Sequence, residues 1–272
     1  MTVINTNVSA LRAQTGSRLA NDQLQTAMER LSSGKRINSA KDDAAGLAIA
    51  SSMTSQIRGM TQAVRNANDG ISMAQTADGA LDEVTNMLQR IRELAVQSSS
   101  GTYQDSDRTN LQTEVAALNS QITSVLNNTK FNGVGLFTGS AGSSGTVTIQ
   151  TGSESGDTVS VDFTAVTLNG VSTVDLSTSS GATAALSVLD TAIQTVATKR
   201  ATLGASESQL GSVINNLTSN ITNLSDARSR IQDTDFGVET TNLAKSQILA
   251  QASTAMLAQA NQSQQNVLSL LR

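Results

Sequence analysis

The sequence predicts a mainly α-helical protein: long antiparallel helical rods in a coiled-coil-like bundle, with paired terminal helices and a small β-rich insert. Three observations predict it. Apolar residues recur three and four positions apart over long stretches. Proline, the commonest helix breaker, is absent from the 272 residues, which permits very long uninterrupted helices. Aromatic residues make up only 2% of the chain, so the core must consist of small aliphatic side chains, which favour closely packed helix seams.

The longest apolar stripe runs from residue 46 to residue 95. Its members keep the three-four alternation with one phase slip: Gly46, Ala50, Met53, Ile57, Met60, Val64, Ala67, Ile71, Ala74, Ala77, Leu81, Val84, Leu88, Ile91 and Ala95. At a rise of 1.5 Å per residue, a helix of about 50 residues is roughly 75 Å long, which a compact domain cannot contain. We expect the carboxylates of Asp42 and Asp43 to stabilise the positive end of this helix.

A shorter helix and a β-rich insert follow the first rod. Gly101 predicts a turn that ends the rod, and the next helix is expected to begin near Asp105 and to stop near Asn128. Asn132 and Gly133 predict a tight turn, because both tolerate positive φ. From residue 139 to 182 the chain is rich in Gly, Ser, Thr and Val, and the period-two alternation of 146–150 and 158–163 predicts a hairpin.

The helical period returns from residue 186 to 231. The stripe consists of Leu186, Leu189, Ile193, Val196, Arg200, Leu203, Glu207, Leu210, Ile214, Leu217, Ile221, Leu224, Arg228 and Ile231. We expect this second rod to lie antiparallel to the first, with the β-rich insert at the far end.

Both ends of the chain carry further apolar stripes. The residues that we expect to pack between subunits are Ile4, Val8, Leu11, Leu24, Met28, Leu31, Leu249, Met256, Leu257, Val267, Leu268, Leu270 and Leu271. They lie on more than one side of their helices, and a helix with two apolar faces needs more than one neighbour. Because the two ends can pair with each other only once, the remaining apolar surface indicates burial between copies of the chain.

Composition argues against catalysis and against several classes of partner. The chain has no His and no Cys, so the usual proton shuttle, thiolate nucleophile and transition-metal ligands are missing, and we expect no catalytic site, cofactor or metal. The net charge is -4 and no basic run occurs, which disfavours nucleic acid. No apolar stretch is long enough to span a membrane. The first eight residues have neither a charged nor an apolar region typical of a signal peptide, so we expect any export to proceed without a cleaved signal.

One flank of the first rod carries charge beside an apolar residue. Since Ile91 and Ala95 lie on the stripe, Arg90, Glu93 and Leu94 are expected toward the flank, with Leu94 exposed. This pattern fits an ordinary solvated face, and it also fits a contact between subunits.

Several segments outside residues 139–182 are distinctive: Ile4-Asn5-Thr6-Asn7, residues 31–50 with Leu31-Ser32-Ser33-Gly34 and Ala45-Gly46-Leu47-Ala48-Ile49-Ala50, residues 89–97, Lys130-Phe131-Asn132-Gly133, residues 225–231 and the final residues 257–272. Through these segments the chain resembles bacterial flagellin over nearly everything outside residues 139–182. Their order along one chain makes the resemblance specific.

The resemblance implies a structural subunit of the flagellar filament, located outside the cell. It implies that residues 1–40 with 236–272 form the polymerisation domain lining the lumen, that 41–138 with 183–235 form the shell, and that 139–182 face outward. It further implies export through the flagellar type III apparatus, a cytoplasmic chaperone, and assembly with the flagellar cap and hook-filament junction proteins. In hosts, the flank at Arg90, Leu94 and Glu114 is what a Toll-like flagellin receptor reads in many flagellins.

Two other interpretations stay open at this stage. A hook-filament junction protein has similar end helices, and a cytoplasmic coiled-coil signalling rod shares the low aromatic content. Within the flagellin interpretation we expect residues 1 to about 40 and about 236 to 272 to be disordered in the monomer and to fold on assembly, because an isolated helix gains little without tertiary burial.

Overall fold

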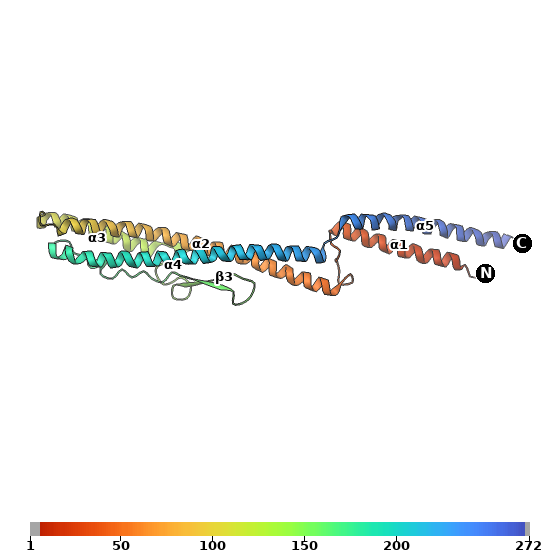
Figure 1. Ribbon diagram of the computed structural model, residues 1–272, viewed down its shortest axis with the longest axis horizontal. Coiled ribbons are helices and arrows are strands. Elements are labelled where there is room, and N and C mark those ends of the chain that lie inside the picture. Colours follow the sequence, from red (N-terminus) through yellow and green to blue (C-terminus); the bar gives the residue numbers. More distant parts are fainter. Residues whose placement is uncertain (1–5, 270–272) are drawn as a thin grey trace. The chain divides into compact units, whose positions relative to one another are not determined.

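The computed structural model describes the backbone of residues 6–269 and the side chains of residues 6–266. In chain order the elements are α1 (Val8–Ser33), α2 (Ala44–Ser99), α3 (Asp105–Asn128), β1 (Lys130–Phe131), β2 (Val134–Gly135), β3 (Thr146–Gln150), β4 (Thr158–Asp162), a 3-10 turn (Val171–Thr173), α4 (Ser179–Gln232) and α5 (Phe236–Ser269) (Figure 1). The fold class expected from the sequence is confirmed. The chain divides into two compact units: a terminal unit, Met1–Ile57 with Thr222–Arg272, and a central unit, Arg58–Ile221.

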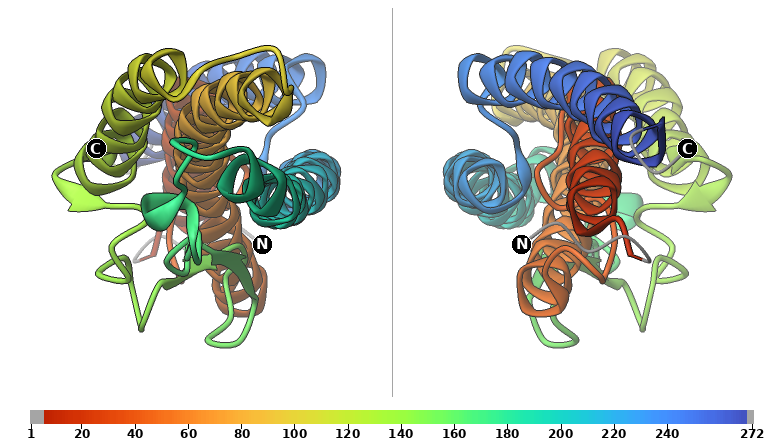
Figure 2. Two further views of the ribbon diagram at one scale, coloured as in Figure 1. Left: turned by 90° about the vertical axis from the view of Figure 1, so that its left-hand side faces the viewer. Right: turned by 90° about the vertical axis from the view of Figure 1, so that its right-hand side faces the viewer.

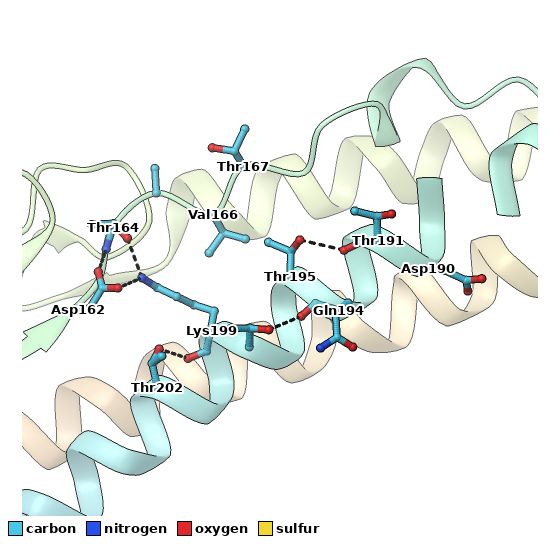
Figure 3. A pocket seen from close by; sticks show the side chains of 12 residues that line it. Asp162, Thr164, Val166, Thr167, Asp190, Thr191, Gln194, Thr195, Lys199 and Thr202 are labelled. Carbon is cyan, nitrogen blue, oxygen red and sulfur yellow. Dashed lines mark hydrogen bonds and ion pairs between the residues drawn. The ribbon is translucent and has the colours of Figure 1, made fainter. Parts of the chain in front are cut away.

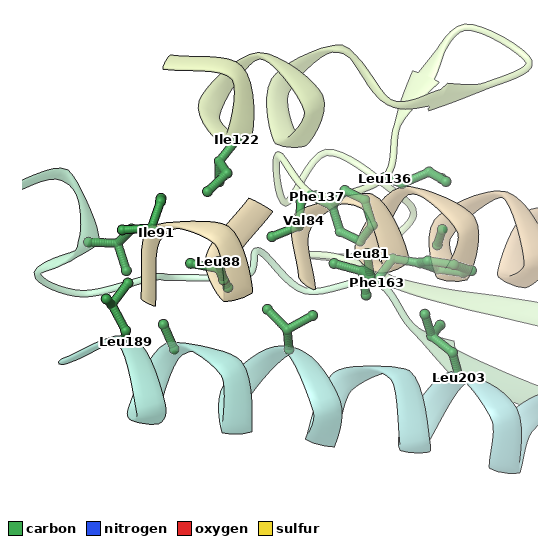
Figure 4. Close-up of a cluster of buried hydrophobic side chains, with 14 of the residues drawn as sticks. Leu81, Val84, Leu88, Ile91, Ile122, Leu136, Phe137, Phe163, Leu189 and Leu203 are labelled. Carbon is green, nitrogen blue, oxygen red and sulfur yellow. The ribbon is translucent and has the colours of Figure 1, made fainter. Parts of the chain in front are cut away.

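The central unit has a continuous apolar core between its helices. Figure 4 shows Leu88 and Ile91 of α2 directed toward Leu189 of α4, and Ile122 reaching the core from α3. All members of the α2 stripe from Ala74 to Ala95 are fully buried, so the predicted seam is confirmed here. Ion pairs from Arg92 to Asp190 (2.7 Å) and from Arg200 to Asp78 (2.8 Å) show that α2 and α4 run antiparallel.

Two short hairpins interrupt the helices. Asn132 (φ 48°) and Gly133 (φ 81°) form the tight turn between β1 and β2, as expected. Strands β3 and β4 pair antiparallel with Val147 opposite Val161, which confirms the second hairpin.

The position expected for the β-rich insert is wrong. The β3–β4 hairpin lies alongside the long helices rather than at their far end, because Ile149 packs against α2 at Gly70 and Asn66 donates to the Gln150 carbonyl at 3.2 Å. A Cβ at Gly70 would collide with Ile149 Cδ1 and lie 3.2 Å from Leu210 Cδ1. The missing side chain of Gly70 therefore leaves room for the Ile149 side chain on α2.

The chain from β4 to α4 is held against α3 by amide side chains. Gln112 donates to the Val174 carbonyl (3.1 Å) and accepts from the Leu176 amide (2.7 Å), and Asn119 donates to the Val171 carbonyl (3.0 Å). These bonds satisfy backbone groups of an irregular segment that no strand pairs with.

A buried arginine closes the turn between α2 and α3. Arg108 is 4% exposed and donates to the carbonyls of Ser100 (2.9 Å) and Tyr103 (3.1 Å). It thus satisfies backbone acceptors of the turn that follows α2.

The terminal unit pairs α1 with α5 antiparallel (Figures 1 and 2, right panel). Asn7 caps α1 by accepting from the Ala10 amide (2.9 Å), and its Nδ2 donates to the Ala260 carbonyl (3.1 Å). At the other end, the connector from α1 to α2 pairs with the connector from α4 to α5 through their backbones. Thr234 N donates to Gly34 O at 3.0 Å, and Lys35 and Asp233 form an antiparallel β-bridge.

Of the two carboxylates expected to stabilise the start of α2, one is placed differently. Asp43 accepts from the Gly46 amide (2.9 Å) and caps the helix. Asp42 instead accepts from the amides of Asn38 (3.0 Å) and Ser39 (2.9 Å), and these bonds lower its pKa. Asp42 therefore stabilises the turn before α2 and not the helix itself.

Candidate functional site

The apolar surface is distributed unequally between the two units. Of the twelve large apolar side chains that are exposed among the described residues, the ten in the terminal unit are Val8, Leu11, Leu19, Met28, Ile49, Phe236, Val238, Ile248, Leu249 and Met256. The other two are Val96 and Val134. By contrast, the buried apolar residues in the described part of the terminal unit are Ala20, Ala27, Ile37, Ala50 and Ala260. The terminal unit therefore exposes its larger apolar side chains and buries mainly alanines.

The residues predicted to pack between subunits fall into two groups. Leu24, Leu31 and Leu257 are partly buried, and they share the heptad positions of the seam between α1 and α5. The remaining described members are exposed: Val8 (46%), Leu11 (62%), Met28 (56%), Leu249 (42%) and Met256 (64%). Ile4, Leu270 and Leu271 lie outside the described residues, as do the side chains of Val267 and Leu268.

The sequence interpretation missed the seam that joins α1 to α5. Its most buried members, Ala20, Ala27 and Ser246, are small, so a stripe traced through large side chains passes over them. It also left out Leu19, Ile248 and Phe236, which belong to none of the predicted stripes. In the structure these three large apolar side chains are exposed. The seam could have been predicted from the three-four spacing of Ala and Ser along the two terminal helices.

On the flank of the central unit, Arg90 joins α2 to α3. Its Nε donates to Glu114 Oε1 at 2.9 Å and its Nη1 to Glu93 Oε2 at 3.0 Å, and these bonds raise the pKa of the Arg90 guanidinium. The side chains of Arg90 and Glu114 are 50% and 44% exposed. The two residues thus form an accessible pair of opposite charges.

The expected exposure of Leu94 is wrong. Leu94 is 1% exposed and belongs to the core of the central unit. The sequence interpretation gave α2 a single apolar seam, whereas α3 and α4 both cover it, so α2 buries a wider arc than one stripe. The surface of the flank consists of charged groups, with Leu94 beneath them.

A groove of the central unit lies between α4 and the chain that follows β4. It has a volume of about 680 Å³ and is lined largely by threonines (Figure 3). Lys199, whose side chain is 10% exposed, is engaged by Asp162 (2.8 Å) and by the Thr164 hydroxyl (2.8 Å). The hydroxyl of Thr195 donates to the Thr191 carbonyl one turn earlier, at 2.8 Å. The groove therefore contains no nucleophile paired with a free base.

Among the described residues, no group of three or more side chains of the kinds that bind metals gathers in one place. None of the helices, over the described residues, combines the length and the hydropathy that crossing a membrane requires. Within these residues the structure is that of a helical protein whose terminal helices expose apolar side chains.

Comparison with known proteins agrees with this class. The family model for the bacterial flagellin N-terminal helical region matches residues 4–142, and that for the C-terminal helical region matches residues 186–271. A flagellin of Halalkalibacterium halodurans is 44% identical over 99% of this chain and 100% of its own length. One from Xenorhabdus nematophila is 44% identical over 99% of both chains.

Solved structures give the same result. The crystal structure of Bacillus cereus flagellin is 33% identical with a TM-score of 0.52, over 60% of this chain and 94% of that one. A putative flagellar hook-associated protein from Vibrio parahaemolyticus has a TM-score of 0.63 at 17% identity, over 71% of this chain and 100% of that one, so it shares the fold.

The chain belongs to the bacterial flagellin family. It is a structural subunit of the flagellar filament, a homopolymer, and not an enzyme. The hook-filament junction alternative is not favoured, because both family models and the nearly full-length relatives are flagellins.

Proposed function

We propose that the paired helices α1 and α5 form the polymerisation surface of this flagellin. The observation that carries the proposal is that ten of the twelve exposed large apolar side chains among the described residues belong to the terminal unit. Burying such side chains between copies releases free energy that the isolated chain does not gain. Leu24 and Met28 also line a groove of about 530 Å³ beside α1, which a neighbouring subunit can fill.

The experiment replaces exposed apolar residues by glutamine, which has a helix propensity close to that of leucine and methionine. Leu11→Gln and Met256→Gln should each raise the critical concentration for polymerisation by about ten- to a hundredfold, since burying one such side chain contributes about 1.5–3 kcal/mol. Sedimentation of polymer against total concentration measures it. Electron microscopy should show fewer and shorter filaments at a fixed concentration.

The matched control is Val96→Gln, which removes an exposed apolar side chain from the central unit. Its critical concentration should stay close to that of the parent. Circular dichroism of each unassembled variant checks that helix content is retained. An unchanged critical concentration for both Leu11→Gln and Met256→Gln would contradict the proposal.

We also propose the radial arrangement that the family resemblance implies. Residues 1–40 with 236–272 line the lumen, 41–138 with 183–235 form the shell, and 139–182 face outward. The exposed apolar side chains of α1 and α5 support an inner position, where each subunit has neighbours on several sides. A helical reconstruction of the filament tests this arrangement, and terminal helices on its outer surface would contradict it.

The partners proposed for this flagellin follow the family. They are a cytoplasmic chaperone that holds the C-terminal helix before export through the flagellar type III apparatus, the flagellar cap, and the hook-filament junction proteins. The exposed apolar residues Ile248 and Met256 on α5 support the need for a chaperone. Chaperone binding should be lost in a chain shortened before residue 236 and kept in one with an altered hairpin.

The flank at Arg90 and Glu114 is proposed as a contact for a neighbouring subunit and, in hosts, for a Toll-like flagellin receptor. Its exposed, opposite charges support polar recognition. Leu94 would contribute indirectly, because its buried side chain holds α2 in place within the core of the central unit. Arg90→Ala should weaken receptor activation by monomeric chain, whereas the same change at Arg65, an exposed arginine elsewhere on α2, should leave it unchanged.

A further inference from the structure

The seam between α1 and α5 repeats every seven residues and consists mostly of small side chains. On α1 the partly or fully buried residues that follow this repeat are Ala10, Ala13, Ser17, Ala20, Leu24, Ala27 and Leu31. On α5 they are Glu239, Leu243, Ser246, Ala250, Ser253, Leu257 and Ala260. A shift of one heptad places small residues opposite small residues again, so apolar packing alone specifies the register of this seam weakly.

One charged pair interrupts the small seam. Arg30 Nη1 lies 3.8 Å from Glu239 Oε2, and the side chains are 30% and 7% exposed. The Arg30 Nε is buried without a hydrogen-bond partner. A buried ion pair adds little stability, because desolvation offsets the attraction between the charges. The pair is therefore not explained by stability.

A change of register would separate these charges. A shift of α5 by one heptad in one direction places Glu239 opposite Gln23 and leaves Arg30 beyond the start of α5. A shift in the other direction places Arg30 opposite Ser246 and leaves Glu239 beyond the end of α1. In each case the charge that stays between the helices faces an uncharged side chain, and an unpaired buried charge is unfavourable. The pair therefore disfavours both shifts, whereas contacts between alanines do not.

We propose that Arg30 and Glu239 are positioning residues that fix the register of the α1–α5 pair. The inference rests on the proposed role of the terminal unit, because register decides which outer side chains of the two helices are presented side by side to the next subunit. Contacts far from the pair agree with one antiparallel register: a Cβ at Gly16 would lie 3.5 Å from Ser253 Oγ, and Asn7 donates to the Ala260 carbonyl.

Two simpler explanations must be separated from this one. Arg30 lies in the last turn of α1 and Glu239 in the first turn of α5, where each charge also interacts favourably with the dipole of its own helix. The β-bridge between Lys35 and Asp233 joins the connectors at the same ends of both helices, and it could fix the register without the charged pair.

Because the chain has no cysteine, introduced disulfides can report the register directly. Gly16→Cys with Ser253→Cys reports the observed register, and Gly16→Cys with Ala260→Cys or with Ser246→Cys reports a shift of one heptad in either direction. Each reporter pair is placed in the parent, in Arg30→Met/Glu239→Leu, and in the charge exchange Arg30→Glu/Glu239→Arg. A small amount of each chain is co-assembled with an excess of cysteine-free parent and then oxidised.

The crosslinked fraction within one chain is read from non-reducing gels. Arg30→Met/Glu239→Leu should fold and co-assemble, since apolar replacement of a buried pair is usually tolerated. It should move the ratio of observed to shifted crosslinks by about tenfold toward the shifted forms. The charge exchange should restore the parental ratio, although it places both charges unfavourably for the helix dipoles.

An unchanged ratio in Arg30→Met/Glu239→Leu would mean that the bridged connectors set the register, and would overturn the inference. A charge exchange that behaves like the apolar variant would mean that the charges act only on the helix ends, and would also overturn it. The critical concentrations of Leu11→Gln and Met256→Gln test the terminal unit's role separately from the register.

Discussion

At the scale of single residues, Glu207 is a carboxylate whose position on the α4 seam works against folding. Burial, and then the negative charge of Asp78, raise its pKa. Because the pKa of Glu207 is higher in the folded state than in the unfolded state, its protonated form stabilises the fold. This stabilisation is fully present below the unfolded-state pKa of about 4.5, and it is lost as the pH rises through the folded-state pKa. At neutral pH, Glu207→Gln should therefore raise the free energy of unfolding by up to roughly 1 kcal/mol.

Urea unfolding at several pH values measures this effect. The gain from Glu207→Gln should shrink as the pH falls and should disappear below about 4.5. Glu83→Gln is the control, since Glu83 is exposed on α2, and it should give little gain at any pH. A gain of equal size at acid and neutral pH would show that packing, rather than charge, explains the change at Glu207.

At the scale of elements, Gly70 and Gly79 of α2 allow one substitution to be compared in two environments. A Cβ at Gly79 would meet nothing within 4 Å, so Gly79→Ala should stabilise by about 0.5–1 kcal/mol through helix propensity. A Cβ at Gly70 would collide with Ile149 Cδ1, so Gly70→Ala should destabilise despite the same propensity gain. Thermal or urea unfolding measures both.

A second substitution tests the cause assigned to Gly70. Ile149→Val removes the colliding Cδ1 atom, so Gly70→Ala should become less destabilising, or stabilising, in that background. If Gly70→Ala has the same effect in the parent and in the Ile149→Val background, the hairpin does not settle on α2 through this contact.

The elements differ in how far the sequence could predict them. The seams of α2 and α4 are built from Leu, Ile and Val at a regular spacing, and this pattern predicts both helices. The location of the β3–β4 hairpin depends on a contact between Ile149 and Gly70, residues far apart in the chain, which no local pattern reveals. Leu94 was misplaced for a similar reason, because the number of helices that cover α2 is a tertiary property. At the termini, the exposed Leu11 and Met256 could be proposed as association residues, but the seam of alanines between α1 and α5 carries too weak a signal.

At the scale of the whole molecule, the two units should differ in stability before assembly. The central unit buries Leu, Ile, Val and Phe side chains in one continuous cluster, whereas the terminal unit buries four alanines and one isoleucine among its described apolar residues. Alanine contributes little apolar area, so the α1–α5 pair gains little from burial to offset the conformational entropy of ordering two long helices. In the unassembled chain we therefore expect α1 and α5 to open far more often than the helices of the central unit.

Amide hydrogen exchange, followed by mass spectrometry on peptides, measures this difference. In the unassembled chain, amides of residues 8–33 and 236–266 should exchange within the shortest labelling times, while those of 77–95 and 185–210 stay protected. In the filament, all four segments should be protected, because neighbouring subunits cover Leu11, Met28 and Met256. Strong protection of α1 and α5 before assembly, equal to that of the central unit, would contradict folding on assembly. It would mean that the α1–α5 pair forms first and that subunits join through a surface already in place.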